Sequence, residues 1–92
     1  MDNDGQADAS ELVDLLRNAT FPQTRIRPGY NIGDVDAFLG KIAEALNRGE
    51  QVDPELIHRV QFGTTRLRPG YDEEVVDAFL DKVEGAIRRN AL

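Results

Sequence analysis

The hydrophobic residues of the chain recur at helical spacing in four stretches. The two longest, 35–46 and 76–87, place an apolar residue at every third or fourth position, which forms one stripe along a helix. Two shorter stretches, 12–19 and 56–60, follow the same spacing. The stripes consist of Leu12, Leu15, Leu16 and Ala19; Val35, Phe38, Leu39, Ile42 and Leu46; Leu56, Ile57 and Val60; Val76, Phe79, Leu80, Val83 and Ile87. The pattern predicts a mainly α-helical fold with Phe38 and Phe79 in its core.

A polar residue that can cap a helix precedes each stripe. Ser10, Asn31, Asp53 and Asp72 carry side-chain oxygens that can accept a hydrogen bond from the free backbone N–H groups of a first turn. Pro54 follows Asp53 at the first helical position, where its missing N–H has no cost. These residues predict where the four helices begin.

The second half of the chain repeats the first. When Thr24 is placed over Thr65, segment 24–39 aligns with 65–80 without a gap, and Phe21 falls on Phe62. Such a match indicates an internal duplication. The predicted organisation is a disordered acidic tail at 1–9, followed by a single domain at 10–92 that contains two repeats, 10–49 and 53–90.

Each repeat reads as helix, extended loop and helix, and each loop contains the sequence Arg-Pro-Gly-Tyr. Proline followed by glycine is typical of a type II turn, which needs a positive φ at the glycine. Because a residue before proline is held extended, 24–27 and 65–68 are expected to be extended, with short strands as an alternative. The tyrosines are expected to pack the turns onto the following helices and to hydrogen-bond through their hydroxyls. The structural residues of the turns are Pro28, Gly29, Tyr30, Pro69, Gly70 and Tyr71.

Neither repeat can bury its apolar stripes alone, so the repeats are expected to pack against each other. The simplest arrangement is a four-helix core with a pseudo-two-fold axis. We expect a monomer that contains this internal pseudo-dimer. The short connection at 47–52 leaves a swapped homodimer as the alternative.

Composition and charge exclude several classes of function. The chain has 92 residues, no cysteine, 17 acids, 11 bases and a net charge of −6. This balance argues against a nucleic-acid partner. His58 is the single histidine and Ser10 the single serine, so neither a metal site nor a Ser-His-Asp triad is expected. Nucleotide-binding motifs are missing. The sequence therefore predicts no enzyme, no catalytic residue, no metal and no cofactor.

The two loops hold the best candidate site. Its residues are Arg25, Ile26, Arg27, Arg66, Leu67 and Arg68. The arginines could contact anionic lipid headgroups or an acidic partner. We instead expect at least one arginine in each loop to pair with Asp36 or Asp77, which recur at the same offset. The isolated aliphatic residue of each loop is expected to lie in the core.

Both repeats resemble the DivIVA domain of bacterial cell-division and polar-growth proteins. The resemblance rests on an aromatic, a basic residue, Gly-Tyr-Asp, acids and then Val-Asp-Ala-Phe-Leu, at 21–39 and more closely at 62–80. It implies a dimerising scaffold whose loops expose an apolar and a basic residue to the membrane. Positions 26–27 and 67–68 match that pair. The chain departs from the family in lacking a bulky aromatic there, in its loop prolines and in having no heptad run after either repeat.

The expected function is a non-enzymatic interaction or scaffold module that acts through contact with an unidentified protein partner. The alternative is a peripheral protein that binds anionic membrane surfaces through the two arginine-rich loops. The acidic N-terminus is unlike a signal peptide. We therefore expect a cytoplasmic protein, which under the alternative lies at the inner face of the membrane.

Overall fold

Each repeat forms two helices with a pair of two-residue strands between them. The computed structural model describes residues 9–90. The elements are α1 (Ala9–Asn18), β1 (Gln23–Thr24), β2 (Gly29–Tyr30), α2 (Ile32–Asn47), α3 (Pro54–Arg59), β3 (Thr64–Thr65), β4 (Gly70–Tyr71) and α4 (Glu73–Asn90). The mainly helical prediction is confirmed. Of the tail predicted at 1–9, residues 1–8 lie outside the described residues and Ala9 belongs to α1.

Three of the four predicted caps are present. Asn31 accepts a 2.9 Å hydrogen bond from the Asp34 N–H, Asp53 one of 2.9 Å from Glu55, and Asp72 one of 3.0 Å from Glu74. Ser10 is not a cap, because α1 already begins at Ala9. The strong caps therefore fix the starts of α2, α3 and α4.

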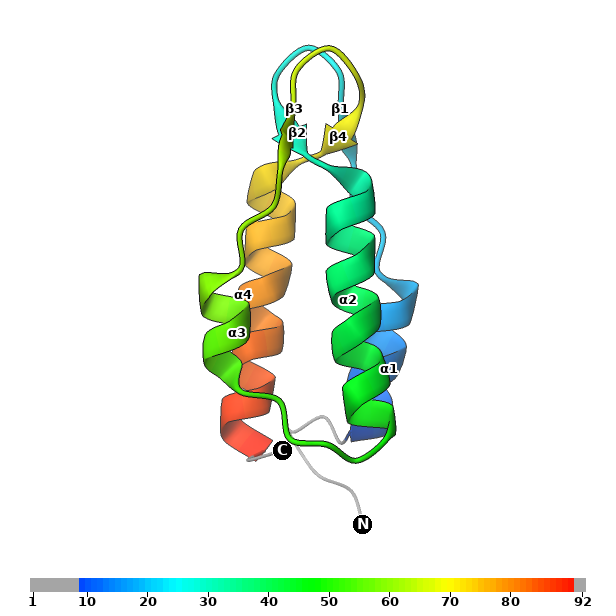
Figure 1. Cartoon of the computed structure of the whole chain (residues 1–92), viewed down its shortest axis with the longest axis vertical. Helices are drawn as coiled ribbons and strands as arrows, with labels where there is room; N and C mark the ends of the chain where they lie inside the picture. Colours follow the sequence, from blue (N-terminus) through cyan, green and yellow to red (C-terminus); the bar gives the residue numbers. More distant parts are fainter. Residues whose placement is uncertain (1–8, 91–92) are drawn as a thin grey trace.

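The four strands form a small antiparallel sheet in the order β1-β4-β2-β3. Every pairing joins one repeat to the other: β1 pairs with β4, and β2 pairs with both β3 and β4. The strands expected at 24–27 and 65–68 are displaced, since 25–27 and 66–68 form bends beyond the strand ends. The loops are thus not hairpins but two segments that cross, as Figure 1 shows at the top of the molecule.

The predicted type II turns are wrong. Among the described glycines only Gly49, just after α2, has a positive φ, at 78°. Gly29 is instead required by a close approach, because a Cβ there would lie 2.7 Å from both the Thr24 Oγ1 and the Tyr71 carbonyl oxygen. A Cβ on Gly70 would lie 2.9 Å from the Tyr30 carbonyl oxygen. The glycines allow the two backbones to cross in contact.

All four helices contribute to one hydrophobic core, in which α1 packs on α2 and α3 packs on α4. Leu15 and Leu56, expected in the core, are 53% and 56% exposed. On α1 the buried residues are Leu12, Val13 and Leu16, and Leu15 lies to one side of that stripe. Leu56 lies beside the buried Ile57 in the same way. The repeated leucines therefore belong to the surface.

Aromatic side chains connect the two repeats. Phe21 makes edge contacts with Tyr71 and Phe79, at ring-centroid distances of 5.1 and 5.5 Å. Phe62 makes the corresponding contacts with Tyr30 and Phe38, at 5.2 and 5.8 Å. Phe38 and Phe79, expected to be fully in the core, are partly buried at its edge and pack against it. Each repeat thus completes the aromatic packing of the other.

Candidate interaction site at the loop tip

The two crossed loops form one end of an elongated molecule with principal extents of 48 × 21 × 18 Å. We define the loop tip as residues 25–28 and 66–69. In Figure 1 it lies at the opposite end of the long axis from the start of α1 and the end of α4. The loop tip extends past the sheet, so no other element covers it.

The aliphatic side chains of the loop tip are almost completely exposed. Ile26 is 98% exposed and Leu67 is 99% exposed. The prediction that they lie in the core is wrong, because the bends at 25–27 and 66–68 project beyond every helix. Scattered exposed aliphatic residues are common on protein surfaces. Two at equivalent positions, each between two arginines, are a repeated feature and therefore a candidate contact surface.

One loop arginine has a structural partner. The Arg27 guanidinium donates to the Asp72 carboxylate at 2.8 Å, and the two side chains are 69% and 18% exposed. Within residues 9–90, Arg25, Arg66 and Arg68 make no ion pair. The expected pairing with Asp36 or Asp77 is therefore wrong for both loops: in the first loop Arg27 pairs with Asp72 instead, and in the second no arginine forms an ion pair within residues 9–90.

The two aspartates that were expected to pair with arginines accept hydrogen bonds from tyrosines instead. The Tyr30 hydroxyl donates to Asp77 Oδ1 at 2.8 Å, and the Tyr71 hydroxyl donates to Asp36 Oδ1 at 2.8 Å. Burial, followed by the bonded carboxylate of Asp77, raises the pKa of Tyr30 to about 12. Burial and Asp36 raise the pKa of Tyr71. The expected hydroxyl hydrogen bonds are confirmed, but each bond holds the base of a loop on the helix of the other repeat and not on the helix that follows the tyrosine.

One difference between the aligned repeats explains why an arginine of the first loop forms an ion pair while those of the second loop form none within residues 9–90. Asp72, the partner of Arg27, has Asn31 as its counterpart in the first repeat. Asn31 caps α2 as Asp72 caps α4, but it has no charge to offer Arg68. The second loop consequently presents both of its arginines to solvent, around a hollow of about 430 Å³ lined by Thr64, Thr65, Arg66, Leu67 and Arg68.

Charge is strongly divided along the molecule. The loop tip carries four arginines and no acid, whereas the remainder of the chain has all 17 acids and only 7 bases, a net −10. Such separation gives the surface opposite potentials at different places. The loop tip should attract anionic surfaces that the rest of the molecule repels.

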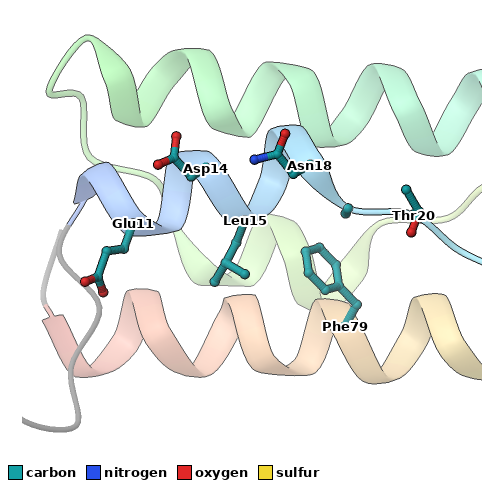
Figure 2. Close-up of a pocket in the computed structure, with 7 residues that line it drawn as sticks. Glu11, Asp14, Leu15, Asn18, Thr20 and Phe79 are labelled. Carbon is teal, nitrogen blue, oxygen red and sulfur yellow. The ribbon is translucent and has the colours of Figure 1, made fainter.

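Sequence reasoning missed a second feature, a groove beside the exposed leucine of α1. In Figure 2, Leu15 from α1 and Phe79 from α4 point toward each other across it. A smaller counterpart involves Leu56 and Phe38. The signal was present in the repeat, since Leu15 and Leu56 align. Because both leucines were assigned to the buried stripes, the groove was not predicted.

No group of three His, Cys, Asp or Glu side chains in 9–90 is arranged to hold a metal ion. His58 is exposed on α3, with Nδ1 3.6 Å from a Glu84 carboxylate oxygen. No helix within this part of the chain has the length and apolar character needed to cross a bilayer.

Comparisons with known proteins give no family assignment: no family model, no curated protein and no solved structure matches the chain.

Proposed function

We propose that this chain is a non-enzymatic, DivIVA-like adaptor that contacts anionic membrane surfaces through its loop tip. The observation that carries the proposal is the nearly complete exposure of Ile26 and Leu67 between arginines. An aliphatic residue that projects beyond the fold can enter the apolar part of a bilayer, while neighbouring guanidinium groups remain with the phosphates.

The expected strength of this contact is modest. Each arginine near an anionic surface contributes about 1 kcal/mol, and complete burial of a leucine or isoleucine contributes about 1.5–3 kcal/mol. Neither kind of contribution suffices alone for stable attachment. Binding should therefore need both the charges and the aliphatic pair, should be reversible and should weaken with salt.

The experiment is co-sedimentation with phosphatidylglycerol vesicles and with phosphatidylcholine vesicles, at low and physiological salt. We expect salt-sensitive pelleting with the anionic vesicles alone. Replacing Ile26 and Leu67 by serine, or Arg25 and Arg66 by glutamate, should abolish it. Because these side chains are exposed and make no ion pair within the described residues, the variants should remain folded.

A matched control reverses two charges elsewhere. Arg17 on α1 and Lys41 on α2 are exposed and make no ion pair within residues 9–90. Arg17→Glu with Lys41→Glu changes the net charge as much as the loop variant does, and it should leave pelleting nearly intact. Equal loss in both variants would mean that net charge alone governs binding, and the proposal would be wrong.

The second candidate is a scaffold that contacts an acidic protein with the same loop tip. The grooves beside Leu15 and Leu56 favour it, because they offer further apolar contact surface. Absence of vesicle binding at every salt concentration, together with capture of a partner that depends on Arg25 and Arg66, would select the scaffold.

The proposal includes a pseudo-two-fold, four-helix arrangement closed within one chain. It is supported by contacts that recur with the repeats exchanged, such as Tyr30 with Asp77 and Tyr71 with Asp36. The two repeats of a single chain would then form the four-helix arrangement that two identical chains form in a symmetric dimer. Light scattering at low micromolar concentration should give the mass of one chain, and a mass of two would indicate swapping.

A further inference from the structure

The groove beside Leu15 has the character of a binding surface. It has a volume of about 420 Å³ and lies between α1 and α4. Its apolar part consists of Leu15, Ala19 and Phe79, and its lining on α1 also includes Glu11 and Asp14. Toward the end of α4 it continues past Lys82 and Arg89. Acids therefore lie on its α1 side, and bases lie on the α4 side of the continuation.

The repeat supplies a natural comparison, the groove beside Leu56. Its volume is smaller, about 290 Å³, and its lining includes Arg59 at the position that corresponds to Asn18. Its acids are Asp53, whose carboxylate caps α3, and Glu55, which is bonded to Arg59 at 3.3 Å and to Arg88 at 3.0 Å. A basic ligand would meet the Arg59 cation, a neutralised Glu55 and a carboxylate that already accepts a helix-cap hydrogen bond there.

The groove beside Leu15 differs in charge. Asp14, the counterpart of Glu55, makes no ion pair within residues 9–90. An aliphatic side chain could fill the apolar part against Leu15 and Phe79 while a cation approaches Asp14. The groove thus selects a short segment with an aliphatic residue next to arginine or lysine.

The molecule itself carries two such segments, Arg-Ile-Arg at 25–27 and Arg-Leu-Arg at 66–68. We propose that the groove beside Leu15 binds the loop tip of a second copy of this chain. Either Ile26 or Leu67 inserts between Leu15 and Phe79, and a flanking arginine contacts the α1 side of the groove. The loop tip has a charge of +4 and the remainder of the chain a charge of −10. Contact between a tip and a groove is therefore favoured over contact between two tips or between two grooves.

The contact joins two different surfaces, so it leaves one loop tip and one groove free in every pair. Such heterologous contacts extend into open chains. Because the contact area is small, the dissociation constant is on the order of 0.1–1 mM. Membrane binding and self-association use the same loop tip, so each copy held at a bilayer has a free groove and no free tip.

Sedimentation of the protein alone, without lipid, tests this directly. Between about 20 µM and about 1 mM, a range that brackets the expected dissociation constant, the weight-average mass should rise about two- to fivefold at low salt. At about 1 M salt, where the Debye length is ~3 Å, the rise should be much smaller.

Two variants separate the surfaces. The groove variant is Asp14→Lys with Leu15→Ser, and the tip variant is Ile26→Ser with Leu67→Ser. Neither should associate with itself. An equal mixture should form a one-to-one pair that does not grow further, because only one productive tip and one productive groove remain. Leu56→Ser is the matched control, since Leu56 is exposed to the same extent as Leu15, and it should associate like the unmodified chain.

A constant mass over the whole concentration range would overturn this inference, as would equal loss of association in Leu56→Ser or a mixture that stays monomeric. A different result would contradict the membrane proposal. The groove variant should still pellet with anionic vesicles, so loss of association alone counts against the groove, and loss of vesicle binding alone counts against membrane contact.

Discussion

At the scale of single residues, the crossing of the two loops depends on the absence of two side chains. At Gly70 an added Cβ would meet the Thr65 hydroxyl, the Tyr30 carbonyl oxygen and the Gly29 backbone. Two of these groups are main chain and cannot rotate away. The requirement is thus for space between strands, since neither Gly29 nor Gly70 has a positive φ.

We expect Gly70→Ala to lower the free energy of unfolding by about 1–3 kcal/mol, the usual effect of forcing atoms into a packed site. Gly40→Ala is the control, because nothing lies within 4 Å of the added Cβ inside α2. That change should raise the free energy of unfolding by about 1 kcal/mol through helix propensity. Urea denaturation measures both, and equal effects would contradict the crossing argument.

The sequence identified the important residues of the loops but assigned several of them, including both Pro-Gly glycines, the wrong physical role. Pro-Gly suggested a turn because local rules connect glycine with positive φ. The actual cause, the backbone of the other repeat, is far away in sequence. The acids at 36 and 77 were likewise recognised as repeated, yet their partners are tyrosines of the other repeat. Local caps such as Asp53 could be predicted, whereas contacts between repeats could not.

At the scale of elements, the loops are held to the helices by tyrosine–aspartate bonds. Because the folded state keeps the Tyr30 proton up to a pKa of about 12 and an unfolded tyrosine loses it near pH 10, the bond contributes full stability below pH 10. Between about pH 10 and 12 only the unfolded state releases the proton, so that contribution declines. The raised pKa of Tyr71 acts in the same direction.

Tyr30→Phe should therefore lower the free energy of unfolding at neutral pH by about 0.5–1.5 kcal/mol, the value of one hydrogen bond. Its stability should also fall less steeply above pH 10 than that of the unmodified chain. Urea denaturation at a series of pH values gives both quantities. Every other titratable group is common to both proteins, so the difference isolates the tyrosine. Identical slopes would refute the assignment.

A pair of compensating differences also appears at this scale. The Gly63 N–H donates to Asp34 at 2.9 Å. With the repeats exchanged, the counterparts are Pro22 in the first repeat, which has no N–H, and Val75 in the second, whose side chain has no acceptor. Donor and acceptor are thus present together or absent together. The helices and the repeat could be predicted from the sequence, but this relation needs the β1–β4 and β2–β3 pairings, which two-residue strands do not reveal.

At the scale of the whole molecule, strand pairing and aromatic packing join the two repeats. All strand pairings join them, and Phe21 finds its aromatic partners in the second repeat. Residues 9–50 alone would expose the faces that α4 and β4 cover. The repeats are therefore expected to fold together, as one cooperative unit.

We expect the separate fragments 1–50 and 51–92 to have little helix by circular dichroism, and an equimolar mixture to recover the helical spectrum of the intact chain. Recovery should be concentration-dependent because it is bimolecular. A fragment that folds cooperatively as a monomer would show that the repeats are independent. A helical homodimer of one fragment would instead show that two copies of the same repeat can replace the pairing of the two different repeats.

The position of the loop tip has a mechanical consequence. The tip lies at one end of a molecule whose longest extent is 48 Å, and α1 begins and α4 ends near the other. If the loops bind a surface, a cargo linked to either of those ends would lie at a fixed height above that surface. The chain would thus act as a spacer, with a reach that depends on the lengths of α2 and α4.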